Sequence, residues 1–298
     1  MSQSNITANR HGQALIYMAG YALCYALLWA LVRLLSEDLH PFQLVFFRTF
    51  LGLVFVLPAL RRIDTSQLWK IPRPLYFFRA FVNISSVFGA FYAVSHIPLA
   101  DAVAYSYMAP IFATIMAAIF LQEKLRLPRI LAILCAFAGM LILLRPGFRD
   151  LDPGVIAALA SALFFAATMT SVKKLTASDH PTIVTIYGFA LGAPISLVVA
   201  LFFWQWPTAL QWPLILALGL LSLFAHICMA RAFSMAEMTA VLPVDFTRLI
   251  FASVIGISFF GDPFDLYTWI GAAIILGSAV YVAYRENRRR KIPQAPTP

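Results

Sequence analysis

The chain has 298 residues, of which 61% are hydrophobic and only 12% are charged. Soluble domains carry about 45–50% apolar and about 25% charged residues, so this composition excludes a soluble globular protein and predicts a polytopic membrane protein. The net charge is +9, but the densest basic run, Arg285–Lys291, directly follows an apolar segment. This position is typical of a cytoplasmic membrane flank, and because no nucleic-acid-binding motif accompanies it, we expect no nucleic-acid partner.

The start of the chain predicts a membrane span and not a cleaved leader. Residues 1–12 are polar, and the long apolar stretch after them has no small-residue cleavage site. We therefore expect a cytoplasmic tail at 1–12 followed by a first spanning helix.

The cysteines and motifs predict no metal site and no cofactor. Cys24, Cys135 and Cys228 lie in apolar stretches at unrelated spacings, so neither a disulfide framework nor a metal cluster is indicated. No Walker motif or other nucleotide-binding loop occurs, so ATP is not expected to be the direct energy source.

The apolar segments predict ten membrane-spanning helices, because a helix that crosses a bilayer needs about 20 apolar residues. In chain order they are 13–34, 42–60, 74–95, 100–121, 128–145, 154–174, 182–204, 212–232, 238–260 and 266–284. The connections between them are short and leave no room for a soluble domain. The expected fold is therefore an all-α polytopic membrane protein.

Lysine and arginine residues predict the orientation, because they collect on the cytoplasmic side of membrane proteins. With the N-terminus inside, sixteen of them fall in inner segments, and three, Arg33, Arg145 and Arg149, fall in outer segments. Both termini, including the basic tail at 285–298, are then cytoplasmic. The expected location is the plasma membrane, which in a bacterium is the inner membrane.

The two halves of the chain resemble each other. "SEDLHPFQLVFFRTFLG" (Ser36–Gly52) aligns with "TASDHPTIVTIYGFALG" (Thr176–Gly192) at an offset of 140 residues. We expect a first repeat at 13–145 and a second at 154–284, each with five spans. An odd number of spans reverses the second repeat in the membrane, and inverted repeats that meet at a central site are a transporter architecture.

Several longer stretches carry a family resemblance. "FFRTFLG" in span two, "PLADAVAYSYMAPIFATIMAAIFLQEKL" across span four and "ARAFSMAEMTAVLPVDFTRLIFASVIGISFFGD" in the second half resemble the drug/metabolite transporter superfamily, EamA type. One departure is Gly261-Asp262, where the family often has Gly-Glu. The resemblance implies ten helices and transport, with a cargo drawn from amino acids, nucleotide-related metabolites, vitamins, carboxylates or drugs.

Charged residues inside the predicted spans indicate a polar site. A charge at the bilayer centre costs roughly 2.5–3.5 kcal/mol on insertion scales. Asp245 and Arg248, three residues apart, share a helix face and can pair. The repeat does not duplicate these charges, which favours an asymmetric polar site over a structural ion pair. The predicted substrate-binding residues are Arg48, Arg79, Asn83, Tyr105, Asp245 and Arg248.

These charges also suggest a class of cargo. Three arginines, Arg48, Arg79 and Arg248, stand against two aspartates, Asp101 and Asp245, which favours a cargo with an anionic group. A structural or membrane-interface role remains open for Arg48 and for Asp101. Several aromatic residues suggest a second reading, in which a flat cargo stacks on rings.

Pro110 and Pro243 fall inside predicted spans four and nine, where a proline bends a helix. They are hinge candidates, with a static kink as the alternative reading.

The sequence thus predicts a secondary transporter that moves a small polar or anionic metabolite by alternating access. The alternative is a riboflavin-like or S-adenosylmethionine-like cargo. A membrane-embedded enzyme is disfavoured because no HExxH or GxSxG motif occurs. Proton coupling through Asp245 or Glu237 is one possible energy source and downhill movement the other, and the sequence decides neither direction nor oligomeric state.

Overall fold

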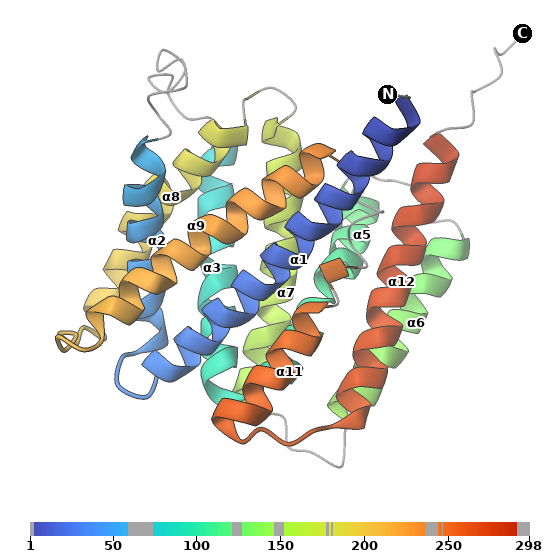
Figure 1. Cartoon of the computed structure of the whole chain (residues 1–298). Helices are drawn as coiled ribbons and strands as arrows, with labels where there is room; N and C mark the ends of the chain where they lie inside the picture. The colour runs from blue at the N-terminus through green and yellow to red at the C-terminus, as the bar shows by residue number, and fades with distance from the viewer. Residues whose placement is uncertain are drawn as a thin grey trace, which may run out of the picture.

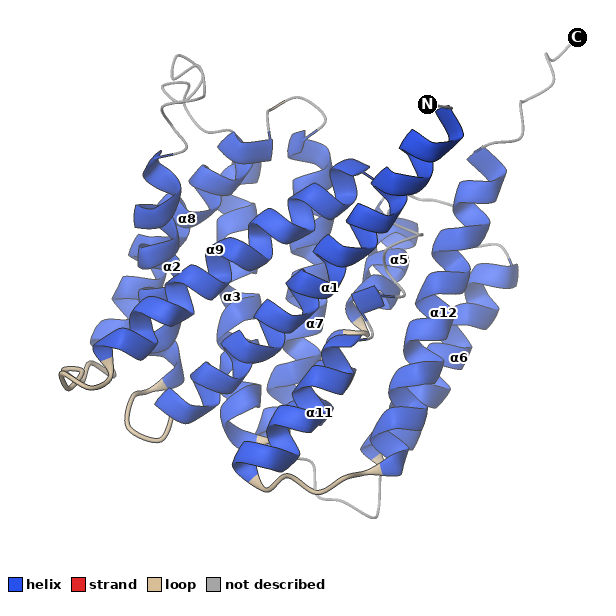
Figure 2. Ribbon diagram, viewed as in Figure 1, coloured by secondary structure: helices blue, strands red, loops and turns tan. Residues whose placement is uncertain are grey.

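A computed structural model of the chain describes residues 3–58, 74–120, 127–145, 152–176, 179, 181–235, 244–245 and 247–290. Throughout these residues the regular structure is helical, and Figure 2 shows helices joined by short loops. The predicted all-α fold is confirmed.

The helices follow the predicted spans closely. In the first half they are α1 (Gln3–Leu35), α2 (Pro41–Val56), α3 (Pro74–His96), α4 (Leu99–Ser106), α5 (Ala109–Phe120) and α6 (Leu127–Leu144). In the second half they are α7 (Pro153–Thr176), α8 (Pro181–Leu201), α9 (Trp212–Met235), α11 (Thr247–Phe260) and α12 (Leu266–Arg290). Several of them begin with proline, whose fixed φ suits the first turn of a helix and whose missing N–H is not needed there.

The outer surface of the bundle suits a lipid solvent. In the described part of the chain, 5 helices are long and apolar enough to cross a membrane, and shorter apolar helices accompany them. Large apolar side chains point outward from many of the helices, among them Ile16, Phe81, Leu134, Val198 and Phe259. Such an apolar exterior would be unstable in water and is stable in hydrocarbon.

The packing of the helices repeats between the two halves. Helix α2 begins at Pro41 and α8 at Pro181, which is 140 residues later. Helix α1 packs on α9 and α3 packs on α7; likewise α2 packs on α9 and α8 on α3. Exchanging the two halves turns the α1–α9 contact into the α7–α3 contact and the α2–α9 contact into the α8–α3 contact. This is expected for two related five-helix units. Figure 1 shows α1 beside α9 at the front, with α6 and α12 paired at one side.

Predicted span four is not one continuous helix. The structure divides it into α4, which ends at Ser106, and α5, which starts at Ala109, with Tyr107 and Met108 in a turn between them. Pro110 lies in the first turn of α5 and has no N–H to donate to the Ser106 carbonyl, so one backbone hydrogen bond of a continuous helix is missing at this break. Pro243, the other hinge candidate, lies outside the described residues.

Close contacts between helices depend on small residues. A Cβ atom placed on Gly139 would lie 2.9 Å from the Gly271 carbonyl oxygen, and one on Gly271 would lie 2.7 Å from the Gly139 oxygen. Helices α6 and α12 therefore touch backbone to backbone at this crossing. At the α3–α7 crossing, the Ser86 and Ser161 hydroxyls each donate to the other's carbonyl, at 3.0 and 2.7 Å.

Candidate functional site

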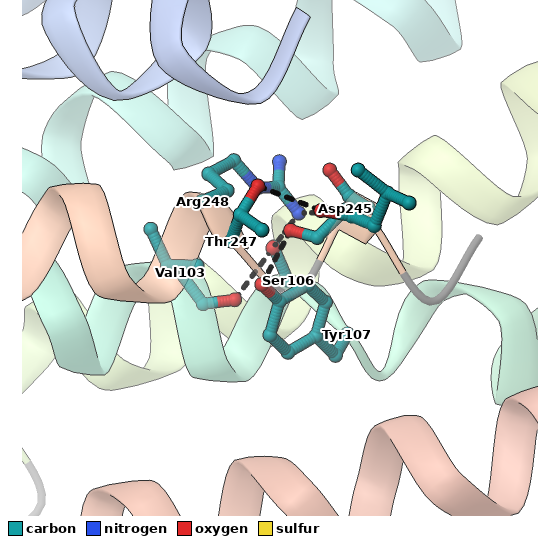
Figure 3. Close-up of polar contacts among 7 residues, drawn as sticks. Val103, Ser106, Tyr107, Asp245, Thr247 and Arg248 are labelled. Atoms are coloured by element: carbon teal, nitrogen blue, oxygen red, sulfur yellow. Dashed lines mark hydrogen bonds and ion pairs between the residues drawn. The ribbon is translucent and has the colours of Figure 1, made fainter. Parts of the chain in front are cut away.

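An ion pair lies in the interior of the bundle, between the two halves of the chain. Arg248, in the first turn of α11, is 7% exposed, and its Nη2 donates to Asp245 Oδ2 at 3.1 Å. This is the i, i+3 pair that the sequence predicts, and Figure 3 shows its geometry. Each ion offsets part of the cost of burying the other.

The first half of the chain completes the polar contacts of Arg248. The Arg248 Nη2 also donates to Ser106 Oγ at 3.1 Å, and Ser106 Oγ donates to the Val103 carbonyl at 2.6 Å. The Tyr107 hydroxyl donates to the Asp245 carbonyl at 3.1 Å (Figure 3). Because the turn between α4 and α5 begins at Tyr107, the break in span four brings these polar groups to the ion pair.

Ser106 and Asp245 occupy corresponding places in the two halves. "AVSHIPLADAVAY" in the first half aligns with "AFSMAEMTAVLPV" in the second at an offset of 139 residues, which places Ser106 over Asp245. Both side chains hydrogen-bond to the same guanidinium nitrogen. The polar contact therefore joins equivalent positions of the two repeats, with a hydroxyl on one side and a carboxylate on the other.

Aromatic rings enclose the Arg248 guanidinium. Its carbon atom lies 5.7 Å from the Tyr25 ring, 5.7 Å from the Trp29 ring and 5.2 Å from the Tyr107 ring, within the range of cation–π attraction. Tyr21, Tyr25 and Trp29 follow one another at four-residue intervals on α1, and adjacent members of this row are in ring contact. We call Tyr25, Trp29, Ser106, Tyr107, Asp245 and Arg248 the Arg248 cluster.

The sequence reasoning did not select Tyr21, Tyr25 or Ser106 as site residues. The spacing of the aromatic residues on α1 was a usable signal, because residues four apart share a helix face. Ser106 was detectable only as the repeat counterpart of Asp245.

The Arg248 cluster retains hydrogen-bonding capacity. Asp245 Oδ1 and Arg248 Nε are buried and have no hydrogen-bond partner within the described part of the chain. One is an acceptor and the other a donor, so a small molecule with both kinds of group has a partner for each.

Arg79 and Arg48 lie apart from the Arg248 cluster. The Arg79 Nη1 donates to the Val184 carbonyl of α8 at 2.7 Å, and a Cβ atom on Gly188 would overlap its guanidinium. Arg48 lies in α2 with its guanidinium carbon 5.9 Å from the Phe91 ring. The imidazole of His226, on α9, lies within electrostatic range of both arginines.

The remaining predicted residues have other surroundings. Asn83 is half-buried on α3, and Tyr105 is buried in the apolar core. Asp101 is buried and accepts a hydrogen bond from Thr268 Oγ1 of α12, which supports a structural role. The structure thus brings Asp245 and Arg248 together and does not gather all six predicted residues at one point.

Comparison with known proteins identifies the family. The EamA-like transporter family matches the chain twice, over residues 12–145 and 152–284. The chain belongs to this family. In this EamA-family protein the two matched segments correspond to the two five-helix units of the fold, which in this family form inverted repeats.

Named relatives of this EamA-family protein are transporters. It is 28% identical over 244 residues to the riboflavin transporter of Vibrio cholerae, covering 81% of this chain and 82% of the relative. It is 25% identical over 257 residues to the S-adenosylmethionine uptake transporter of Rickettsia prowazekii, covering 86% and 87% of the two chains. It is 26% identical over 275 residues to the pseudopaline exporter CntI of Pseudomonas aeruginosa, covering 91% and 95%.

A solved structure shares the fold of this EamA-family protein. One crystal structure superposes with a TM-score of 0.61 at 20% identity, covering 94% of this chain and 99% of the other. Together these matches make the protein an integral membrane transporter of the drug/metabolite superfamily.

At one end of the EamA-family bundle, polar contacts join the first repeat to the loop between α11 and α12. Asp262 Oδ2 accepts from Arg33 Nη1 at 2.6 Å and from the Leu99 N–H at 3.1 Å, and Asp265 pairs with Arg145. Asp262 follows Gly261, whose φ of +66° ends α11 and turns the chain. We call this the Asp262 end. A small hollow there is lined by residues that include Asp101, Ser253 and Asp262.

Proposed function

We propose that this protein is a secondary transporter that moves a small polar or anionic metabolite across the plasma membrane by alternating access, with the Arg248 cluster holding the cargo. The single observation that carries the proposal is the buried Asp245–Arg248 pair between the two repeats, with one unpartnered acceptor and one unpartnered donor. Two apolar residues would avoid the burial cost altogether, so the pair is better explained by a polar ligand than by stability.

The topology we propose has both termini in the cytoplasm and, in a bacterial cell, places the protein in the inner membrane. The excess of lysine and arginine in the inner segments supports it. The Asp262 end then faces outward.

Pro110 bends span four beside the cluster and is retained as a hinge candidate together with Pro243.

A second candidate cargo is a flat aromatic compound similar to riboflavin or S-adenosylmethionine. Tyr25, Trp29 and Tyr107 around Arg248 provide ring faces for stacking. Relatives named for the transport of riboflavin and S-adenosylmethionine support this candidate. Since relatives include both an uptake transporter and an exporter, direction has to be measured.

The test begins with detergent-purified protein. Thermal shift against riboflavin, S-adenosylmethionine and a panel of amino and carboxylic acids selects a cargo, whose uptake is then measured in proteoliposomes with and without a pH gradient. A dependence on the gradient separates proton coupling from downhill movement.

We expect Arg248→Ala to lower the flux at least tenfold, because about 1.4 kcal/mol of lost interaction already gives a factor of ten. Arg231→Ala is the matched control: it removes an exposed arginine of α9 that donates a hydrogen bond to the Tyr17 hydroxyl. Wild-type flux through Arg248→Ala, at equal abundance in the membrane, would refute the assignment of the cluster.

A further inference from the structure

Arg48 is a buried arginine without a polar partner among the described residues. It lies in the middle of α2 and is 4% exposed. Its Nε is buried and unpartnered, and its side chain makes no hydrogen bond or ion pair with any described residue. Its guanidinium carbon lies 5.9 Å from the centre of the Phe91 ring.

Other arginines of the described chain are compensated. Arg33, Arg145 and Arg248 each pair with an aspartate, and Arg79 donates to a backbone carbonyl. Arginine keeps its charge in proteins, so Arg48 cannot escape the cost of burial by losing a proton. A distant ring contact compensates only part of that cost.

No described carboxylate supplies Arg48 with a compensating negative charge. His226 lies within electrostatic range of both Arg48 and Arg79, and no carboxylate pairs with either arginine in the part of the chain that the structure describes. The His226 Nδ1 lies 2.7 Å from the Ser222 carbonyl, so Nδ1 carries the hydrogen and donates it. The Ser222 hydroxyl, wholly buried on α9, also has no hydrogen-bond partner in the described ranges.

We propose that Arg48 binds the anionic group of the cargo, a carboxylate or a phosphate, at a subsite formed by α2, α3 and α9. This inference rests on the proposed transport function and narrows its cargo to an organic anion. The guanidinium offers parallel N–H donors that match the two oxygens of either group. The Arg248 cluster then holds the remaining part of the cargo, and the two sites act on different groups of one molecule.

A purely structural Arg48 gives a different expectation. If Arg48 stabilises the fold by itself, Arg48→Gln lowers the melting temperature in every buffer. If Arg48 instead binds an anion, its charge is uncompensated in the empty protein, and Arg48→Gln removes that charge. Without a binding anion, the variant should then melt no lower than the wild type.

The experiment measures the melting temperature of the full-length protein in detergent, with sodium phosphate and with sodium acetate, each against sodium chloride at equal ionic strength. The two salts separate a phosphate from a carboxylate preference. We expect one of them to raise the wild-type melting temperature by about 5 °C when present well above its Kd. Arg48→Gln should lose this rise, Arg48→Lys should keep a smaller one, and Arg231→Gln should keep it in full.

The proposal is overturned if neither salt stabilises the wild type beyond chloride, or if Arg48→Gln responds as the wild type does. If Arg48→Gln cannot be purified, the wild-type response and its reduction in Arg48→Lys decide the question. No flux enters this measurement, so its failure leaves the role of Arg248 in transport to be judged separately.

Discussion

At the scale of single residues, each charge inside the bundle is handled differently. Asp245 and Arg248 compensate each other's charge, and Ser106 accepts a further hydrogen bond from Arg248. Arg79 reaches a backbone carbonyl in the space left by Gly188. Arg48, Arg79 and Arg248 are the same residue type, but the fold gives each a different neighbour: an aromatic ring, a backbone carbonyl and an aspartate, respectively.

Variants of the Asp245–Arg248 pair should show its contribution to stability separately from its contribution to transport. Asp245→Leu alone leaves Arg248 buried without its carboxylate and should destabilise the protein by about 3–5 kcal/mol. The double variant Asp245→Leu/Arg248→Leu removes both ions and should recover most of that loss, because a buried pair is often no more stable than apolar residues of similar volume.

Melting temperature in detergent reports the stability, and proteoliposome flux reports the transport. The double variant should be folded and inactive. A double variant that transports at the wild-type rate would show that the pair is structural.

At the scale of helices, close packing depends on positions where a side chain has no room. Helices α6 and α12 cross where Gly139 and Gly271 approach each other's carbonyl oxygens. Gly277, two turns further along α12, has no atom within 4 Å of the place where a Cβ would stand. The two glycines of one helix therefore offer a matched comparison.

Gly271→Val should push α12 away from α6 and destabilise the protein by about 1–3 kcal/mol, as overpacking does in well-packed interiors. Gly277→Val should have a much smaller effect. Thermal unfolding of the two variants tests this, and equal losses would contradict the idea of a tight crossing at Gly271.

The sequence predicted the helices well because a bilayer imposes long apolar segments, and the proline-marked starts of α2, α3 and α8 agree with the predicted spans. It also predicted the Asp245–Arg248 pair, because helical spacing alone places the two on one face. It could not predict where α4 ends, because Pro110 indicates a bend but not which residues form the turn.

The sequence also failed to show that Arg79 and Arg248 lie apart. Arg79 turns toward α8 because Gly188 leaves space there, and that depends on how α3 packs against α8. Such contacts between distant segments leave no pattern within either segment.

At the scale of the whole molecule, ion pairs and a hydrogen bond join the two repeats at the Asp262 end. Asp262 joins α1, α4 and the end of α11, and Asp265 adds the pair with Arg145. An alternating-access transporter must release contacts of this kind when that end opens. The polar contacts there are therefore expected to set how often the end opens.

Asp262→Asn should open the Asp262 end more often, because it removes the charge that holds Arg33. The readout is the rate at which a thiol reagent labels a Ser253→Cys probe in the lining of the adjacent hollow, with the native cysteines replaced by serine. We expect labelling to become several-fold faster. Glu37→Gln, an exposed change near the same end, is the control. Unchanged labelling in Asp262→Asn would show that the contact does not limit opening.

Ser106 and Asp245 bind the same guanidinium, and this affects the relative free energies of the two forms of a carrier. A carrier with two identical halves would have inward-facing and outward-facing forms of equal free energy. Here one half brings a neutral hydroxyl and the other a charged carboxylate to the same nitrogen. Under the alternating-access mechanism proposed above, this chemical difference would make the two forms unequal in free energy, so the empty carrier would favour one of them.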